Sequence, residues 1–156
     1  MKTALKWTAG WLVCCAALVA GFEGLETKTY LDVGGVPTIC YGETKGVTLG
    51  DTATPEECRQ MLAARLERDF GPGVDRCLTH PVPPQRKAAY VSLAYNIGTE
   101  GFCRSSIARK ENAGDVRGAC NAILLYNKVR SSHGLVISRG LDNRRRAENK
   151  ICLETA

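Results

Sequence analysis

The longest apolar stretch of the chain lies close to its N-terminus. Residues 7–22 carry Thr8 as their only strongly polar side chain, and Lys2 and Lys6 precede them. Positive charge followed by an apolar run is typical of an export signal. This run of sixteen residues is slightly shorter than the roughly 17–25 residues that cross a bilayer, and Ala and Gly dilute it. We therefore expect a weakly hydrophobic helix at this end.

The hydrophobic pattern changes after Tyr30 to a glycine-punctuated run of β-forming residues. Residues 34–39 read Gly-Gly-Val-Pro-Thr-Ile, which is typical of a tight turn that leads into a strand. Since the apolar helical run ends about ten residues earlier, the sequence predicts a helix followed by a small β region.

The remainder of the chain has the pattern of a series of helices. Residues 54–57 read Thr-Pro-Glu-Glu, which combines an N-cap, a proline in the first turn and a capping box. Apolar residues at helical spacing predict further helices over 85–95 and 116–124. Ser105 and Asp115 are typical helix caps, and no histidine or G-x-S-x-G motif suggests that Ser105 is a nucleophile.

Composition narrows the class of protein only moderately. The chain has 156 residues, a length that fits one domain with a substantial core. Its 44% hydrophobic and 24% charged residues are ordinary for a soluble globular protein. The net charge of +5 suits an anionic partner such as a bacterial cell wall or a membrane face. Because no nucleic-acid motif accompanies it, we expect no nucleic-acid partner and interpret residues 144–146, three consecutive arginines, as a helix face that pairs with carboxylates.

Two carboxylates and a hydroxyl follow the apolar run in close succession. Asp32 stands nine positions after Glu23, and Thr38 stands six positions after Asp32. Glycoside hydrolysis needs one carboxyl group that is protonated as an acid and a second that is ionised. The spacing alone fits two solvated surface charges equally well. The choice between a catalytic pair and two surface charges therefore depends on the neighbouring residues.

The neighbouring residues resemble the active-site segment of the phage T4-type lysozymes, in particular the lambdoid-phage endolysin branch. In that family a helix ends in Glu-Gly, and Tyr-x-Asp, a glycine turn and Thr-Ile-x-Tyr-Gly follow. The chain fills these places in order at residues 23–24, 30–32, 34–35 and 38–42. The resemblance covers roughly residues 16–153 and includes Asn-x-Gly at 96–98, Asn-x-Gly-Asp at 112–115 and Gly-Leu-x-x-Arg-Arg-x-x-Glu at 140–148.

The resemblance implies an α+β, lysozyme-like fold, mostly helical, with a small β-hairpin lobe and an active-site cleft between the lobes. It also implies a muramidase that cleaves the β-1,4 bond between N-acetylmuramic acid and N-acetylglucosamine in peptidoglycan for host cell lysis. Glu23 would protonate the leaving oxygen, while Asp32 and Thr38 would hold and activate a water on the opposite face of the sugar. This arrangement inverts the anomeric centre and needs carboxyl groups roughly 6.5–9.5 Å apart.

The resemblance suggests three supporting residues. Tyr41 and Asn96 are candidates for substrate contact beside the cleft, although Asn96 equally fits a buried turn residue. Arg145 is the candidate for orienting Glu23. The chain departs from the family pattern where Glu43 replaces the usual histidine, which adds a third carboxylate if its side chain faces the cleft. It departs again at residue 126, where tyrosine replaces tryptophan.

Residues 1–21 allow three interpretations. A signal peptide cut after Ala20 would leave Glu23 as the third residue of the mature chain, without the helix that should position it. A plain core helix would not explain the two leading lysines. We favour an uncleaved export segment, similar to the signal-arrest-release segments of some lambdoid endolysins. It would tether the protein through residues 7–22 to the host inner membrane on its periplasmic side before release, with 22–156 as the catalytic domain.

Eight cysteines are many for a chain of this length. They are Cys14, Cys15, Cys40, Cys58, Cys77, Cys103, Cys120 and Cys152. Without C-x-x-C pairs or neighbouring histidines we expect no metal site, and the even count favours disulfides in an oxidising compartment. Buried free thiols are the alternative. Connectivity does not follow from sequence; our working assignment is Cys77–Cys103, Cys120–Cys152 and Cys40–Cys58.

The thiols of Cys14 and Cys15 suggest a regulatory role. In lipid they could not reach the folded domain, whereas after release they could attack an existing disulfide, since exchange needs access and a thiolate. Cys40 is the candidate target because it lies two residues from Thr38. In the alternative interpretation both residues are simply small apolar side chains of a helix.

Two other functions remain possible from the sequence. A lytic transglycosylase would use a single acid, which leaves Asp32 and Thr38 without a role. A non-catalytic, membrane-anchored cell-wall binding protein would share the charge, the export segment and the disulfides, but it has no need of Glu23. We expect a monomer that acts on bacterial peptidoglycan without a cofactor.

Overall fold

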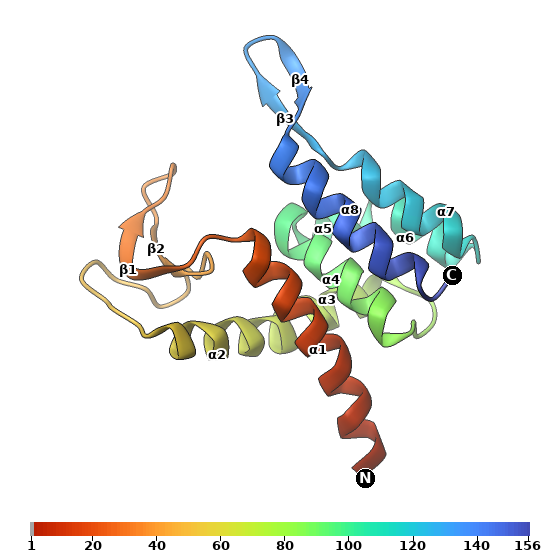
Figure 1. The fold of residues 1–156 in the computed structure, drawn as a ribbon, viewed down its shortest axis with the longest axis horizontal. Coiled ribbons are helices and arrows are strands. Elements are labelled where there is room, and N and C mark those ends of the chain that lie inside the picture. The colour runs from red at the N-terminus through yellow and green to blue at the C-terminus, as the bar shows by residue number, and fades with distance from the viewer. Residues whose placement is uncertain (1) are drawn as a thin grey trace.

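The computed structural model describes the backbone of residues 2–156 and the side chains from Gly10 onward. Its elements are shown in Figure 1. In chain order they are α1 (Lys2–Phe22), β1 (Glu26–Leu31), β2 (Pro37–Cys40), α2 (Pro55–Arg65), the π-helical turn η1 (Leu66–Phe70), α3 (Gly71–Cys77), α4 (Pro84–Ile97), α5 (Thr99–Cys103), α6 (Ser106–Asn112), α7 (Val116–Ala122), the 3₁₀ turn η2 (Ile123–Leu125), β3 (Lys128–Ser131), β4 (Gly134–Ile137) and α8 (Arg139–Leu153).

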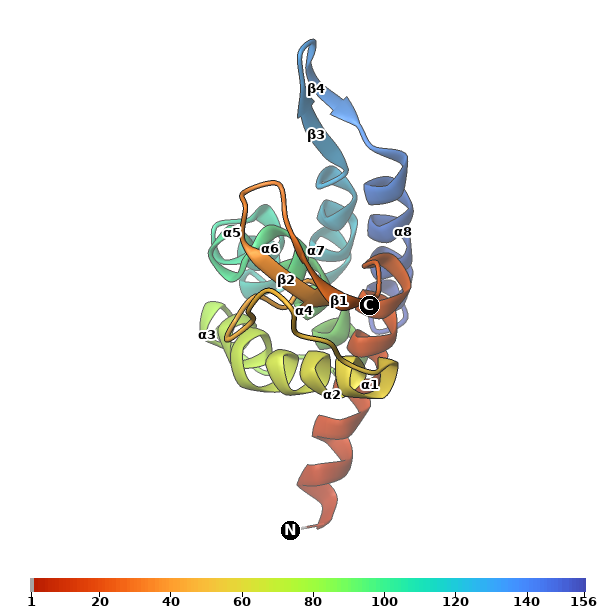
Figure 2. The ribbon, with the colours of Figure 1, turned by 90° about the vertical axis from the view of Figure 1, so that its left-hand side faces the viewer.

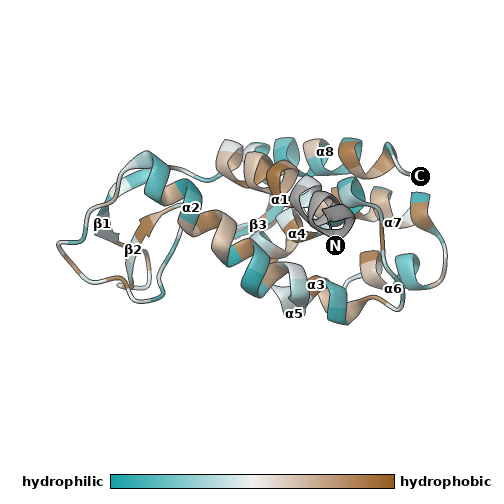
Figure 3. Ribbon diagram, turned by 90° about the horizontal axis from the view of Figure 1, so that it is seen from below, coloured by the Kyte–Doolittle hydropathy of each residue, from teal (hydrophilic) through white to brown (hydrophobic). Residues whose placement is uncertain are grey.

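Helix α4 forms the centre of the larger, helical lobe. Residues 88–94 of this helix are all buried, and α1, α3, α5 and α8 pack around it. A helix that is apolar on every side is typical of a position inside a core. Figure 3 shows an elongated molecule with β1 and β2 at one end, most helices at the other and α2 running between them.

Helix α1 packs into this same core through the part whose side chains the structure describes, from Gly10 onward. Trp11, Cys15 and Val19 recur at four-residue spacing and are buried, while Val13 on the opposite side is 70% exposed. The Lys87 ammonium group lies 4.6 Å from the centre of the Trp11 ring, a cation–π distance. Among the described residues no helix combines the length and hydrophobicity needed to cross a membrane. The side chains of Lys2 and Lys6 lie outside the described residues.

The small lobe is built on the predicted β region. Strands β1 and β2 are antiparallel, with Tyr30 opposite Thr38 and an irregularity in the pairing before Tyr30. Helix α2 begins as its sequence predicts: the Thr54 hydroxyl accepts a hydrogen bond from the Glu57 amide, and the Glu57 carboxylate accepts one from the Thr54 amide.

A second hairpin, β3–β4, was not expected from the sequence. It stands away from the helices between η2 and α8, as Figures 1 and 2 show. Each strand has only four residues, and most of its side chains on both faces are exposed. Because burial does not alternate along these strands, the sequence lacks the period-two pattern that predicts a half-buried strand.

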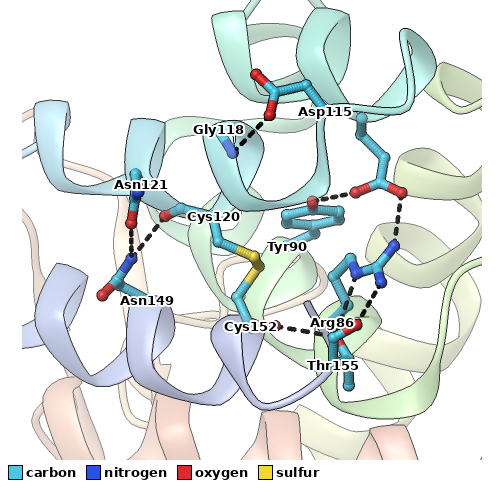
Figure 4. Close-up of a disulfide and its surroundings, with 10 residues drawn as sticks. Arg86, Tyr90, Asp115, Gly118, Cys120, Asn121, Asn149, Cys152 and Thr155 are labelled. Carbon is cyan, nitrogen blue, oxygen red and sulfur yellow. Dashed lines mark hydrogen bonds and ion pairs between the residues drawn. A yellow bond between two sulfur atoms is a disulfide. The ribbon is translucent and has the colours of Figure 1, made fainter.

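Six cysteines form disulfides with the expected connectivity: Cys40–Cys58, Cys77–Cys103 and Cys120–Cys152. The first joins β2 to α2, and the third joins α7 to α8. Figure 4 shows the third bond with Arg86 and Tyr90 of α4 nearby. Both of these side chains donate to the buried Glu111 carboxylate. Cys14 and Cys15 are free thiols.

Candidate active site

Glu23 directly follows α1, at the junction between the two lobes. Its amide donates to the Val19 carbonyl at 2.8 Å, so its backbone still follows the helix. The Glu23 side chain is 29% exposed and lines a cavity of about 330 Å³. The cavity is lined by Phe22, Glu23, Asn96, Ser138, Gly140, Leu141 and Arg144. Two of the residues singled out in the sequence, Glu23 and Asn96, thus line the same cavity.

Arg144 holds the Glu23 carboxyl group. Its Nη1 donates to Glu23 Oε1 at 2.7 Å, its Nη2 to the Ser92 carbonyl at 3.0 Å and its Nε to Glu148 Oε1 at 3.2 Å. The guanidinium is almost fully buried, so three acceptors on three segments fix it. A planar guanidinium suits such a multidentate arrangement because its donors have a fixed geometry.

The structure corrects the assignment of Arg145 as the partner of Glu23. Successive residues of a helix point about 100° apart, so only one of the three arginines faces the Glu23 carboxyl group, and that residue is Arg144. Arg145 turns instead to Asn96, to whose side-chain oxygen its Nη1 donates at 3.0 Å. Arg145 therefore orients the amide of Asn96, which leaves that side chain's NH₂ group available to the cavity.

A buried carboxylate links the two arginines. Glu148 Oε1 accepts hydrogen bonds from Ser92 at 2.7 Å and from Arg145 Nη2 at 3.1 Å. Arg145 Nε lies 2.8 Å from Glu148 Oε2 but is not aligned for a hydrogen bond. Burial raises the pKa of Glu148 against the opposing effect of Arg145, Ser92 and Arg144. Burial likewise lowers the pKa of Arg145.

Asp32 and Thr38 lie together at the turn of the first hairpin. Asp32 Oδ1 accepts from the amides of Gly34 at 2.8 Å and Val36 at 2.9 Å, an arrangement typical of an aspartate that shapes its own turn. The Thr38 hydroxyl is buried and donates to the Val36 carbonyl at 2.9 Å. Neither residue lines the cavity that contains Glu23.

Tyr95 connects the two lobes beside the cavity, a role that the sequence did not predict. Its hydroxyl donates to the carbonyl of Tyr41, directly after β2, and its ring lies 5.0 Å from that of Phe70. Burial raises the pKa of Tyr95 to about 12, so the hydroxyl remains a donor at neutral pH. The sequence held only an indirect signal for this role, which is the position of Tyr95 on α4, next to Asn96 and about one turn after Ser92. The Tyr41 side chain itself is buried.

Glu43 makes a second connection between the small lobe and α2. Its Oε1 accepts from the amides of Thr44 and Lys45, both at 2.9 Å, and from Arg65 Nη1 at 2.8 Å. The Arg65 guanidinium also lies 5.5 Å from the centre of the Phe70 ring. The carboxylate that replaces the family's histidine is thus neutralised by an arginine and lies away from the Glu23 cavity.

Both free thiols lie on α1, and the folded protein covers them to different extents. Cys15 is completely buried in α1 and Cys14 is partly buried, while Cys40 is already bonded to Cys58.

Within the described part of the chain, no three side chains of His, Cys, Asp or Glu gather as metal ligands do. Arginine positions the carboxyl group of Glu23, and backbone amides position that of Asp32.

Comparison with known proteins agrees with this arrangement. The family model described as phage lysozyme matches residues 20–148. The SAR-endolysin of Pseudomonas phage phiKMV is 43% identical over 143 residues, which cover 89% of this chain and 88% of that protein. An endolysin from Escherichia coli O157:H7 phage FAHEc1 superposes with a TM-score of 0.79 at 35% identity and covers 92% of each chain. The muramidase domain of SpmX from Asticaccaulis excentricus gives a TM-score of 0.84 at 27% identity, covering 89% of this chain and 94% of that domain.

These matches confirm the lysozyme-like, mostly helical fold with small antiparallel sheets. They also confirm the resemblance inferred from the motifs, because the matched segment includes Glu23, the first hairpin and the arginines of α8. The match covers well over half of the sequence and relatives of high coverage support it, so the chain belongs to the phage lysozyme family.

Proposed function

We propose that the protein is an endolysin that hydrolyses the β-1,4 bond between N-acetylmuramic acid and N-acetylglucosamine in bacterial peptidoglycan, with inversion at the anomeric carbon. The observation that carries the proposal is the carboxyl group of Glu23, set in a cavity and held by the buried Arg144. The family membership and the muramidase domain among its structural relatives support the same chemistry.

Glu23 is the proposed general acid. Arg144 engages Oε1, and no hydrogen-bond donor within the described residues engages Oε2. That second oxygen can carry a proton and present it to the glycosidic oxygen in the cavity. A proton donor has to lie within hydrogen-bond reach of the atom that it protonates, and the pairing with Arg144 provides the fixed orientation that this requires.

Asp32 and Thr38 are proposed to hold the attacking water. Two turn amides fix Asp32 Oδ1, so Oδ2 can accept a proton from water. The hydrogen of the Thr38 hydroxyl is committed to the Val36 carbonyl, so its oxygen can accept a hydrogen bond but not donate one to that water. Both residues therefore act as acceptors, which orients the water with an oxygen lone pair toward the anomeric carbon.

This pair of acceptors distinguishes the proposal from a lytic transglycosylase. A transglycosylase closes an internal anhydro ring on the sugar and needs one acid but no positioned water. A binding protein without activity has no need of a carboxyl group oriented by a buried arginine. The arrangement of Glu23, Asp32 and Thr38 therefore favours hydrolysis over both alternatives.

Replacing Glu23 with Gln tests the proposal. We expect the Glu23→Gln variant to lose about 10²- to 10⁴-fold in peptidoglycan turbidity clearance, the usual contribution of a general acid, while its circular dichroism and melting temperature stay close to those of the parent. Glu26→Gln is the matched control, since it removes an exposed carboxylate three residues later. Near-full activity of Glu23→Gln would refute the assignment.

We further propose that residues 1–21 export the protein to the periplasm and tether it to the host inner membrane, without cleavage, before residues 22–156 act on the wall. The name SAR-endolysin of the phiKMV relative supports this proposal. The apolar side chains that would lie in lipid include Trp11, Cys15 and Val19, which also fill the core of the folded protein. Membrane residence and packing of α1 on α4 therefore exclude each other.

We propose that Cys14 or Cys15 exchanges with the disulfide of Cys40. For Cys15 this exchange has to precede the packing of α1, because its thiol is inaccessible afterwards, whereas Cys14 stays partly exposed. Thiol–disulfide exchange requires an accessible thiolate. Replacing both free thiols with Ser should delay or abolish activation in a host lysis assay. Unchanged timing of lysis would mean that Cys14 and Cys15 serve only as small apolar residues of the helix.

A further inference from the structure

Glu148 of α8 is a fully buried carboxylate to which the proposed mechanism gives no role. Its exposed fraction is 0%. Its Oε1 accepts hydrogen bonds from the Ser92 hydroxyl at 2.7 Å, from Arg144 Nε at 3.2 Å and from Arg145 Nη2 at 3.1 Å. A charge in a protein interior is costly unless it is paired. The two guanidinium groups therefore hold Glu148 as an anion.

The guanidinium of Arg144 lies between two carboxyl groups. Its Nη1 donates to Glu23 Oε1 at 2.7 Å, and its Nε donates to Glu148 Oε1 at 3.2 Å. One positive charge is thus shared by the proposed acid and by a second, buried carboxylate. Two carboxylates this close repel each other, and a buried pair is only weakly screened by water. The charge of Glu148 therefore opposes ionisation of Glu23.

This opposition resolves a conflict in the proposed site. A general acid has to keep its proton near neutral pH, whereas a guanidinium in contact with a carboxyl group favours the ionised form. Arg144 alone would orient Glu23 and also promote the loss of its proton. The negative charge of Glu148 on another nitrogen of the same guanidinium offsets the second effect and leaves the orienting hydrogen bond in place.

The neighbouring helices add no charge that could replace Glu148. On α4, Ser92 is neutral, and burial raises the pKa of Tyr95 to about 12, so its hydroxyl is neutral as well. On α1, the buried Cys15 thiol is the titratable side chain that faces Glu148, and a thiol is uncharged near neutral pH. The charges that act on Glu23 from within the core are therefore those of α8.

The charges of α8 can be counted. Within the described residues, Glu23 and Glu148 are the carboxylates that lie within 4 Å of Arg144 or Arg145. The cluster of two cations and Glu148 has one net positive charge while Glu23 is protonated. Loss of the Glu148 charge would raise this to two and would draw the proton from Glu23 more strongly.

We propose that Glu148 is a positioning residue whose negative charge, acting through Arg144, keeps the Glu23 carboxyl group protonated near neutral pH. This inference rests on the proposed muramidase function. Glu148 does not touch the substrate, since it is sealed in the core. Its role differs from that of a residue that only stabilises the fold, because it sets the pH range of the activity.

The test measures kcat/KM for clearance of purified cell walls across the pH range at constant ionic strength. Glu148→Gln removes the charge but keeps the shape and an acceptor oxygen, whereas Glu148→Asp keeps the charge and moves it away from Arg144. Glu111→Gln is the matched control. It also removes a fully buried carboxylate paired with an arginine, Arg86 at 2.7 Å, but neither residue lines the cavity of Glu23.

We expect the alkaline fall in activity of Glu148→Gln to move about 1 pH unit lower than in the parent, the scale of one unit charge a few ångströms away. In acidic solution, where Glu23 is protonated without help, its kcat should approach that of the parent. The profile of Glu148→Asp should lie between the two. Glu111→Gln should lose melting temperature yet keep the parent's profile.

Several results would overturn the inference. An alkaline fall of Glu148→Gln at the parent's pH, with a lower melting temperature, would mean that Glu148 only stabilises the fold. A folded Glu148→Gln without activity at any pH would contradict it as well. If Glu148→Gln does not fold, Glu148→Asp decides by the same criterion, and failure of both to fold assigns the residue to stability alone.

The proposed function can fail separately from this inference. Full activity of Glu23→Gln would refute the muramidase assignment and the role of Glu148 with it. An inactive Glu23→Gln, together with an unshifted profile of the Glu148 variants, would overturn only the role of Glu148.

Discussion

At the scale of single residues, the site depends on how three consecutive arginines are divided among different partners. Arg144 orients Glu23, Arg145 orients Asn96, and Arg146 pairs at the surface with Asp142. The helical turn of α8 makes this division unavoidable, since neighbouring side chains point in different directions. The motif predicted that an arginine would support Glu23, but only the rotation of α8 against α1 decides which one.

The division predicts unequal effects of the same substitution. Arg144→Lys should lower the melting temperature and cost about 2–4 kcal/mol, because an ammonium group cannot reach all three buried acceptors. It should also reduce kcat for clearance, since Glu23 loses its fixed orientation. Thermal denaturation and turbidity assays measure both effects. Arg146→Lys, on the exposed side of the same helix, serves as the control and should leave both unchanged. Equal behaviour of the two variants would contradict the assignment.

At the scale of elements, α1 belongs both to the proposed export segment and to the folded core. Its buried residues recur every four positions against α4, so the helix that would have left the membrane is also the one that ends at Glu23. Loss of the helix would remove part of the core and the support of the proposed acid together. The proposed release from the membrane and the assembly of the site are therefore one event.

This coupling predicts that the active protein keeps its N-terminus. Mass spectrometry of the protein extracted from the cell envelope should give the mass of the whole chain. A variant that begins at Gly21 should show a large loss of cooperative unfolding and of clearance, because deletion of the buried side chains of α1 leaves a cavity along α4. A mature mass that lacks residues 1–20, with activity retained, would contradict the coupling.

The sequence predicted elements that have a clear local signal and missed the hairpin β3–β4, which has none. The capping box of α2, the first hairpin and the central helix α4 each have a local signal, as do the caps at Ser105 and Asp115. The hairpin β3–β4 has exposed residues on both faces and therefore no periodic signal. The disulfide pairs agree with the working assignment, but spacing alone could not have selected them from the alternatives.

At the scale of the whole molecule, the proposed function requires that two lobes present different groups to one substrate. In the proposal the helical lobe provides Glu23, Arg144 and Asn96, whereas the first hairpin provides Asp32 and Thr38. Tyr95 bonds to the Tyr41 carbonyl across the junction, and Glu43 ties the small lobe to α2 through Arg65. These contacts involve residues far apart in the chain. Motifs in a single sequence could therefore suggest the candidate catalytic groups, but they could not predict the contacts that set the distance between the two lobes.

The stereochemistry of the first product tests this account most directly. Proton NMR of peptidoglycan fragments, recorded within minutes of adding the enzyme, resolves the anomeric proton of the new reducing end before mutarotation. Attack by a water held at Asp32 and Thr38, opposite Glu23, predicts that the α-anomer appears first from the β-linked substrate. Initial formation of the β-anomer, or of an anhydro sugar without a reducing end, would contradict the proposed mechanism.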